Sequence, residues 1–219
     1  MSRQGKQRAM IRMLVVDDHL VVREGIKRIV ADTPDLCVAG EAQDGQEALE
    51  RLETAAWDVV LLDLALPGRN GLEVLHDVKR THPKVPVLVF SVYAEDQYAV
   101  RALKAGAAGY LTKCCLPEEL VQAIRKVARG GRYVSASLAE YLVVALTEES
   151  DHPLHESLSE REYQVLCLLA AGKKVTAITA ELALSAKTIS TYRARLLDKL
   201  HLHTTGELIH YAIRHGLVA

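Results

Sequence analysis

The chain has 219 residues, of which 49% are hydrophobic, 25% charged and 5% aromatic, and its formal net charge is −1. This composition matches a soluble globular protein with one large domain or two smaller ones. No run approaches the ~20 apolar residues that cross a bilayer, and the basic start is not followed by a secretory apolar stretch. We therefore expect a cytoplasmic protein without a membrane partner. Four unevenly spaced cysteines argue against a disulfide framework or a zinc site.

Residues 11–130 alternate short apolar runs with longer amphipathic stretches. The runs are apolar throughout and rich in β-branched residues, which is typical of parallel strands buried on both faces. The expected strands are 13–16, 36–39, 59–62, 85–90 and 108–111, and the expected helices are 20–31, 46–55, 71–81, 97–104 and 117–128. Five such repeats predict a doubly wound α/β domain, whose functional groups lie beyond the carboxyl ends of the strands.

The rest of the chain has a different pattern. Residues 131–156 are expected to be a linker that contains one helix, at 138–146, and an acidic stretch with a proline at 148–153. Capping boxes at Ser159–Glu162 and Thr204–Glu207 open the first and last of four short helices. The sequence therefore predicts a small all-α domain at 157–219.

Five chemically active side chains follow the expected strands of the α/β half. Three carboxylates would repel one another unless a cation lies among them, and Mg²⁺ prefers such oxygen ligands. A nearby lysine and a hydroxyl would suit phosphoryl oxygens, so the group predicts phosphoryl transfer to a carboxylate. Any one of these residues alone is most simply a surface group, but all five at successive strand ends favour a site. The five are Asp17, Asp18, Asp63, Ser91 and Lys113.

The stretches around these residues resemble the receiver domain of two-component response regulators, which has a flavodoxin-like fold. They are Val16-Asp17-Asp18-His19, the stretch from Leu62 to Gly71, Phe90-Ser91 and Gly109-Tyr110-Leu111-Thr112-Lys113. The resemblance implies that Asp63 accepts a phosphoryl group from a sensor histidine kinase. It also implies that Asp17, Asp18, Asp63 and the main-chain carbonyl of Ala65 hold Mg²⁺. Ser91 and Lys113 would bind the phosphoryl oxygens, and Tyr110 would switch conformation together with Ser91.

The helical half carries a net charge of +3, from eight lysines and arginines against five acidic residues. Basic and hydroxyl side chains recur on one face of the segment 185–200, away from Ile189, Leu196 and Leu200. A short helix precedes this segment, which is the helix-turn-helix arrangement. A solvated basic face would explain the charge equally well. The expected DNA contacts are Lys187, Thr188, Ser190, Thr191, Arg193, Ala194, Arg195 and Lys199.

The residue pattern of this half resembles the LuxR-type helix-turn-helix, and the whole chain resembles the NarL/FixJ class of response regulators. The motifs are Leu158 to Glu162, Leu168 to Gly172, Leu184 to Leu200, Tyr211-Ala212 and Gly216-Leu217. The resemblance implies a phosphorylation-activated transcriptional regulator that is not an enzyme and that binds double-stranded DNA. Its implied partners are a sensor histidine kinase, a second copy paired through 207–214, and RNA polymerase. One departure is Lys174 and Ala177, where the family usually has a capping box.

Two other functions stay open on the residues alone. A Mg²⁺-dependent phosphohydrolase would use Asp63 as nucleophile, but such enzymes place a second acid two residues later, where this chain has Ala65. A receiver module could also act through protein contacts alone, with a vestigial helical half. The near-neutral net charge of the chain does not exclude DNA binding. The linker segment 147–156 carries four acids and no lysine or arginine, and these negative charges offset the positive charge of the helical domain.

Overall fold

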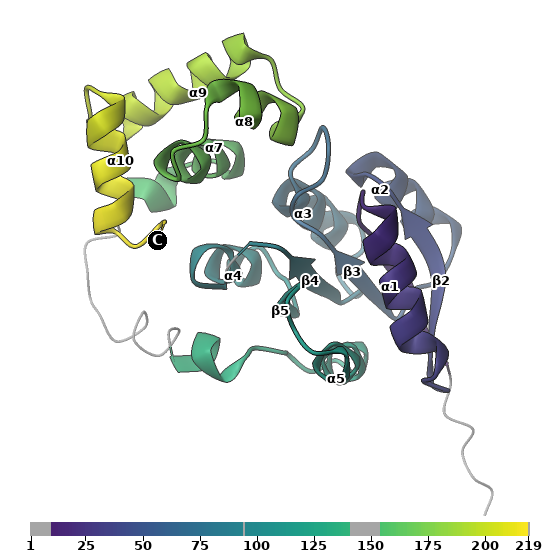
Figure 1. Cartoon of the computed structure of the whole chain (residues 1–219). Helices are drawn as coiled ribbons and strands as arrows, with labels where there is room; N and C mark the ends of the chain where they lie inside the picture. Colours follow the sequence, from purple (N-terminus) through teal and green to yellow (C-terminus); the bar gives the residue numbers. More distant parts are fainter. Residues whose placement is uncertain (1–9, 94, 141–153, 219) are drawn as a thin grey trace, which may run out of the picture.

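The computed structural model describes residues 10–93, 95–140 and 154–218. Five parallel strands form one sheet in the order β2-β1-β3-β4-β5 (Figure 1). This order confirms the expected doubly wound, flavodoxin-like α/β architecture. The strands are β1 (Ile11–Val16), β2 (Leu36–Ala42), β3 (Val59–Leu62), β4 (Val87–Ser91) and β5 (Gly109–Thr112).

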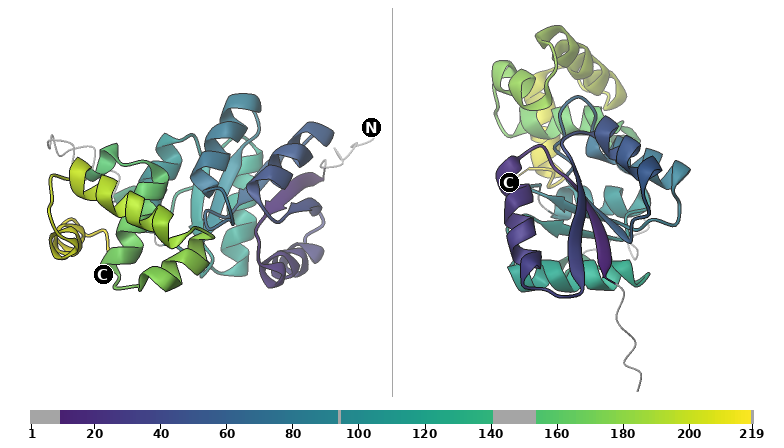
Figure 2. Two further views of the ribbon diagram at one scale, coloured as in Figure 1. Left: turned by 90° about the horizontal axis from the view of Figure 1, so that it is seen from above. Right: turned by 90° about the vertical axis from the view of Figure 1, so that its right-hand side faces the viewer.

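Helices cover both faces of this sheet, as Figure 2 shows. Helices α1 (Leu20–Ala31) and α5 (Pro117–Ala128) pack on one face. Helices α2 (Gly45–Thr54), α3 (Gly71–Thr81) and α4 (Glu95–Lys104) pack on the other. Each inner strand is therefore buried on both sides, which explains why its sequence is apolar without alternation.

The element bounds differ from the predicted ones by a few residues at some ends. Strand β2 continues through Gly40 and Glu41 to Ala42, because an edge strand tolerates partly exposed polar positions. Strand β4 begins after Pro86, which has no N–H to donate and offers only its carbonyl, to Val60. Helices α1, α3 and α5 begin and end where the sequence predicted.

The four expected helices of the C-terminal half are also present. They are α7 (Glu160–Ala170), α8 (Val175–Leu182), α9 (Ala186–Lys199) and α10 (Thr205–Arg214), and a 3₁₀ turn, η1 (Leu154–Ser157), precedes them. Both predicted capping boxes form, on Ser159 and on Thr204. Helix α8 begins after Lys174 without a side-chain cap, as its sequence predicted.

Part of the predicted linker lies outside the described residues. Residues 136–140 are helical, which agrees with the start of the helix expected at 138–146. The remainder of that helix and the acidic segment 148–153 fall within 141–153, which the structure does not describe. Within the described ranges, no helix is both long and apolar enough to span a bilayer.

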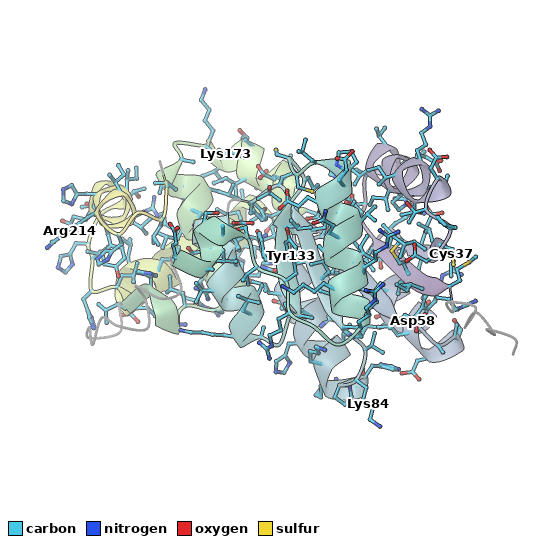
Figure 3. The ribbon with its side chains drawn as sticks, turned by 90° about the horizontal axis from the view of Figure 1, so that it is seen from below. Cys37, Asp58, Lys84, Tyr133, Lys173 and Arg214 are labelled. Carbon is cyan, nitrogen blue, oxygen red and sulfur yellow. The ribbon has the colours of Figure 1, made fainter. Side chains whose placement is uncertain are left out.

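The two halves pack against each other through α4 and α7. All residues from 161 to 170 in α7 are buried, because one side of this helix faces its own domain and the other faces the α/β domain. Figure 3 shows Arg214 of α10 at one end of the molecule and Cys37 of β2 at the other. The α/β half, whose sheet edge carries the acidic residues, and the helical half, which carries α9, therefore share a packed interface.

Candidate functional site: an acidic pocket and a basic helix

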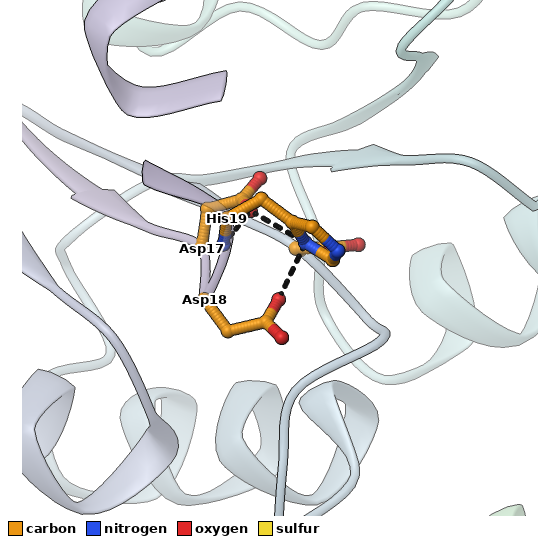
Figure 4. Close-up of side chains that lie close together, drawn as sticks. Asp17, Asp18 and His19 are labelled. Carbon is orange, nitrogen blue, oxygen red and sulfur yellow. Dashed lines mark hydrogen bonds and ion pairs between the residues drawn. The ribbon is translucent and has the colours of Figure 1, made fainter. Parts of the chain in front are cut away.

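The three predicted carboxylates converge at the carboxyl edge of the sheet. Asp17 and Asp18 follow β1, and Asp63 follows β3, which pairs with β1. One oxygen from each of these residues lies within 4.8 Å of the others and of a ring nitrogen of His19. Figure 4 shows the imidazole of His19 beside Asp17 and Asp18, with Nδ1 2.8 Å from Asp18 Oδ1. His19 was not among the site residues predicted from the sequence.

Lys113 and Ser91 complete the pocket as predicted. The Lys113 ammonium lies 2.6 Å from Asp17 Oδ2 and 2.6 Å from Asp63 Oδ2. The Ser91 hydroxyl donates to Asp63 Oδ1 over 2.8 Å, and the main-chain N–H of Ala65 donates to the same oxygen over 3.1 Å. Asp63, only 1% exposed, thus has both carboxylate oxygens held by donors that could also serve a phosphoryl group.

The electrostatics of the pocket favour a charged lysine. Burial opposes the ammonium, but attraction to Asp63 and hydrogen bonds with Asp17 and Asp63 outweigh it and raise the pKa of Lys113. Three carboxylates and one ammonium leave a formal charge of −2 in the pocket. A divalent cation would neutralise that charge.

The donor set therefore fits Mg²⁺. Three of the four side chains that converge there offer carboxylate oxygens, which this hard cation prefers, and the fourth offers a ring nitrogen of His19. Asp18 Oδ1 is buried yet accepts no well-aligned hydrogen bond within the described part of the chain, so it has coordination capacity to offer. The Ala65 side chain is small. The hydrogen bond from the Ala65 N–H to Asp63 Oδ1 keeps the main chain of Ala65 close to Asp63.

Tyr110, the predicted switch residue, is buried on β5 and points toward the loop that follows β4. Its hydroxyl donates to the main-chain carbonyl of Tyr93 over 3.0 Å. Ser91 lies two residues before Tyr93, so the hydroxyl that donates to Asp63 and the partner of Tyr110 share one short segment. Ser91 and Tyr110, which the sequence predicted to act together, are therefore connected through the main chain of Tyr93.

The predicted DNA-contacting residues lie mostly in the open on α9. Ile189 and Leu196 are buried and anchor this helix to the domain core. Ser185 caps the helix by accepting from the main-chain N–H of Thr188. Six of the eight predicted residues are exposed and make no ion pair with an acid within the described part of the chain, namely Lys187, Ser190, Thr191, Arg193, Ala194 and Arg195.

Lys199 differs from the other basic residues on α9. Its ammonium lies 2.7 Å from the carboxylate of Glu162, a buried residue of α7. Burial opposes the Glu162 charge, but hydrogen bonds from Lys199 and Ser159 outweigh it and lower the pKa of Glu162. The structure thus gives Lys199 a partner inside its own domain, in addition to the role that the sequence predicted.

A buried polar cluster between the two halves was not found by sequence reasoning. Gln164 of α7, 1% exposed, accepts hydrogen bonds from Asn70 and Arg161 through its side-chain oxygen. Its amide nitrogen donates to the Tyr93 hydroxyl over 3.3 Å. Arg161 also donates to the main-chain carbonyl of Gly68 over 2.7 Å. The one sequence signal was a polar residue, Gln164, directly before the apolar run at 165–170.

Aromatic side chains surround this cluster. The rings of Tyr93 and Tyr98 stack at 4.5 Å, and Tyr98 meets the edge of Tyr163 from α7 at 5.3 Å. The Arg101 guanidinium lies 4.2 Å from the centre of the Tyr163 ring and donates to the main-chain carbonyl of Leu158. Burial raises the pKa of Tyr93 to about 12, so its phenol stays neutral at physiological pH.

Family models match both halves of the chain. The model of the response regulator receiver domain matches residues 13–125, and the model of the luxR family of bacterial regulatory proteins matches residues 156–212. The chain is a response regulator with a LuxR-type DNA-binding domain. It belongs to the NarL/FixJ class, as the sequence motifs indicated.

Curated relatives agree with this assignment over nearly the whole response regulator. It is 42% identical to the response regulator UvrY of Escherichia coli (strain K12) over 209 residues, which cover 95% of this chain and 96% of the relative. It is 43% identical to the response regulator GacA of Pseudomonas aeruginosa over 210 residues, which cover 95% and 98%. The similarity therefore includes both domains.

Solved structures show the same arrangement of folds. RcsB of Salmonella typhimurium is 25% identical with a TM-score of 0.66, covering 93% of this chain and 96% of the other. A complex of RcsB with DNA matches with a TM-score of 0.58 over 92% of this chain and 97% of the other. The response regulator ChrA is 28% identical with a TM-score of 0.52, covering 95% and 99%. The protein is thus a phosphorylation-dependent, DNA-binding regulator.

Proposed function

We propose that Asp63 is the residue that accepts the phosphoryl group, and that a phosphohistidine of a sensor kinase is the donor. A carboxylate oxygen of Asp63 attacks phosphorus, a P–O bond forms, and the P–N bond to the kinase imidazole breaks. The released imidazole nitrogen takes up a proton. The observation that carries this proposal is the convergence of Ser91, Lys113 and the Ala65 N–H on the two oxygens of Asp63.

Asp17, Asp18, Asp63 and the main-chain carbonyl of Ala65 would hold Mg²⁺ in this pocket. When bound, the cation supplies positive charge that offsets the repulsion between the carboxylate nucleophile and the phosphoryl oxygens. Lys113, whose ammonium lies 2.6 Å from Asp63 Oδ2, supplies a second positive charge, and Ser91 offers a hydrogen bond to a phosphoryl oxygen. The chain's own side chains thus orient the acceptor and stabilise the transferred group.

Phosphorylation is proposed to reach the DNA-binding domain through Tyr93. A phosphoryl group on Asp63 draws the Ser91 hydroxyl toward it, and Tyr110 then moves into the space that Ser91 leaves. That movement breaks the bond from the Tyr110 hydroxyl to the Tyr93 carbonyl. Because the Tyr93 phenol is a partner of Gln164, the buried polar cluster between the domains loosens. A local electrostatic change thereby shifts a two-state contact.

The released domain is proposed to read double-stranded DNA with α9 in the major groove. Arg193, Arg195 and Lys187 would neutralise phosphates, and the small polar residues near the start of the helix would approach base edges. Two copies paired through α10 would match a two-fold operator.

The proposed division of the chain is 11–130 for the receiver domain, 131–156 for the linker and 157–219 for the DNA-binding domain. RNA polymerase is a further proposed partner, and the cytoplasm the proposed location.

The surface around the pocket supports docking of a kinase helix. Val21 and Leu20 at the start of α1 are 83% and 59% exposed, and Leu116 before α5 is 69% exposed. These apolar side chains project from the loops and helix starts at the same edge as Asp63, where a phosphohistidine must approach. An amphipathic helix that carries the phosphohistidine would bury them during transfer.

A regulator rather than a phosphohydrolase is the function that the pocket supports. Ala65 occupies the position where such hydrolases carry a second acid, and the two acids beside Asp63 in the pocket, Asp17 and Asp18, are the proposed cation ligands. The test incubates full-length protein with Mg²⁺ and acetyl phosphate, then selects bound sequences from a pool of random duplexes. Enrichment of a two-fold sequence by the wild type but not by Asp63→Ala supports the proposal. Equal enrichment by both would refute the phosphorylation step.

A further inference from the structure

Arg23 of α1 buries a guanidinium group directly behind the acidic turn that follows β1. The residue is 6% exposed, although an arginine near the start of a surface helix would normally extend into water. Burying a charge costs several kcal/mol unless the group is well paired. The packing of α1 against the sheet is provided by Ile26 and Val30, so it does not require this guanidinium.

Among the described residues the guanidinium has two partners, one directly after β1 and one on β2. Its Nη1 donates to the main-chain carbonyl of Asp17 over 2.7 Å. Its Nε donates to a carboxylate oxygen of Glu41 over 3.0 Å, and Glu41 belongs to β2. Arg23 therefore connects the first residue of the acidic turn to the adjacent strand.

This contact holds the peptide unit between Asp17 and Asp18. The carbonyl of that unit accepts from Arg23, and the N–H of Asp17 donates to Ala42 of β2 over 3.0 Å. The orientation of this peptide sets ψ of Asp17 and φ of Asp18, and so determines where both carboxylates point. No other hydrogen bond to the Asp17 carbonyl is found among the described residues.

Lys27 provides an internal comparison. Its ammonium lies 2.9 Å from the other carboxylate oxygen of Glu41 and also pairs with Glu24, one turn away on α1. It carries the same charge as Arg23 and shares a partner, but in the described structure it makes no contact with the acidic turn. Loss of Lys27 therefore removes a positive partner from Glu41 and Glu24 while leaving the contact of Arg23 with the acidic turn in place.

We propose that Arg23 is a positioning residue for the divalent cation, and this inference rests on the Mg²⁺ site of the proposed function. By holding the peptide between Asp17 and Asp18, Arg23 places both carboxylates in the orientation that coordination requires. Partners that orient metal ligands typically contribute about 10- to 100-fold in metal affinity. An effect in this direction opposes simple electrostatics, because removal of a nearby positive charge should strengthen cation binding.

The experiment measures the dissociation constant of Mn²⁺ alone, from the free-ion electron paramagnetic resonance signal, for four full-length proteins. They are the wild type, Arg23→Met, Arg23→Lys and Lys27→Met. Arg23→Met is expected to bind about tenfold more weakly, Arg23→Lys to an intermediate degree, and Lys27→Met within about twofold of the wild type. At saturating Mg²⁺, labelling of Arg23→Met by acetyl phosphate should return to the wild-type rate.

The outcomes separate this inference from the proposal on which it rests. Binding by Arg23→Met that equals or exceeds that of the wild type overturns the positioning role while the cation site stands. An equal loss in Lys27→Met also overturns it, because the effect would then belong to Glu41. A wild type that binds no Mn²⁺ refutes the cation site itself, and with it this inference. Arg23→Lys keeps the test decisive if Arg23→Met fails to fold.

Discussion

The side-chain nitrogen of Gln164 lies 3.3 Å from the phenol oxygen of Tyr93 and joins the first helix of the DNA-binding domain to the loop after β4. Tyr93 also receives the hydroxyl of Tyr110 on its main-chain carbonyl. One residue thus contacts Tyr110, the predicted switch residue, through its backbone and the DNA-binding domain through its side chain. A movement of Tyr93 would therefore disturb the contact between the domains.

Replacing Gln164 by Leu is expected to raise the affinity of the unphosphorylated protein for duplex DNA. While the two domains are in contact, the change removes the hydrogen bonds that Asn70, Arg161 and Tyr93 make with Gln164. Each buried group that loses its bond costs about 1–3 kcal/mol. These groups become hydrated when the domains separate, so the separated form gains population. We expect at least about a fivefold tighter dissociation constant in fluorescence anisotropy.

Gln46→Leu on α2 is the control for this prediction. Gln46 donates to Glu50 on an exposed face of α2, in the receiver domain. Its substitution should leave DNA affinity unchanged. Equal affinities of wild type and Gln164→Leu, with phosphorylation still raising both, would show that the polar cluster does not restrain the DNA-binding domain.

Two arginines and one lysine on α9 should respond differently to substitution. Arg193→Ala and Arg195→Ala each remove an exposed positive charge, so each should weaken binding to all duplexes and lower the slope of log affinity against log salt by about 1. Lys199→Met breaks the ion pair with Glu162 and should chiefly destabilise the domain. Salt titrations of binding and thermal melts of the same variants distinguish the two effects.

The Glu162 carboxylate predicts an acid sensitivity of the DNA-binding domain. Its pKa is lowered in the folded state, because bonds from Lys199 and Ser159 outweigh the effect of burial. Its stabilisation, about 1 kcal/mol, is therefore fully present above the ordinary pKa of 4.5 and is lost as pH falls through the lower folded value. Calorimetry should show the stability advantage of the wild type over Glu162→Gln shrinking from pH 6 to pH 3.5. A constant difference across this range would contradict the assignment.

The exposed apolar surface beside the pocket predicts a separation between two phosphodonors. Val21→Asp places a charge where the proposed kinase helix would bury a valine that is 83% exposed in the free protein. Transfer from an autophosphorylated sensor kinase that labels the wild type should slow by about tenfold or more. Labelling by acetyl phosphate should be unchanged, since that donor needs no docking surface. Equal slowing with both donors would indicate damage to the pocket rather than lost docking.

The local patterns of the sequence were sufficient to predict the elements and the pocket. Strands buried on both faces produce apolar runs, and the ends of parallel strands meet at one edge, so Asp17, Asp63, Ser91 and Lys113 could be grouped before their distances were known. Ser159 and Thr204 capped their helices because a capping box depends only on residues three apart.

Contacts between distant segments could not be predicted in this way. Asn70 and Gln164 are 94 residues apart, and neither lies in a pattern that indicates a partner in the other domain. The bond from Arg23 to the Asp17 carbonyl ends on a backbone atom, which has no residue-type signature. The pairing of Lys199 with Glu162 depends on how α9 crosses α7, and charge counting assigned that lysine to DNA alone.

Mapping of the phosphorylated residue is the most direct test of whether Asp63 accepts the phosphoryl group. Full-length wild type and Asp63→Ala are incubated with Mg²⁺ and acetyl phosphate, reduced with borohydride, which converts an aspartyl phosphate to homoserine, and analysed by peptide mass spectrometry. If Asp63 is the acceptor, homoserine appears at position 63 in the wild type, and Asp63→Ala yields no labelled peptide. Circular dichroism checks that Asp63→Ala is folded. Undiminished labelling of Asp63→Ala, or homoserine at another aspartate of the wild type, would contradict the assignment of Asp63 as the acceptor.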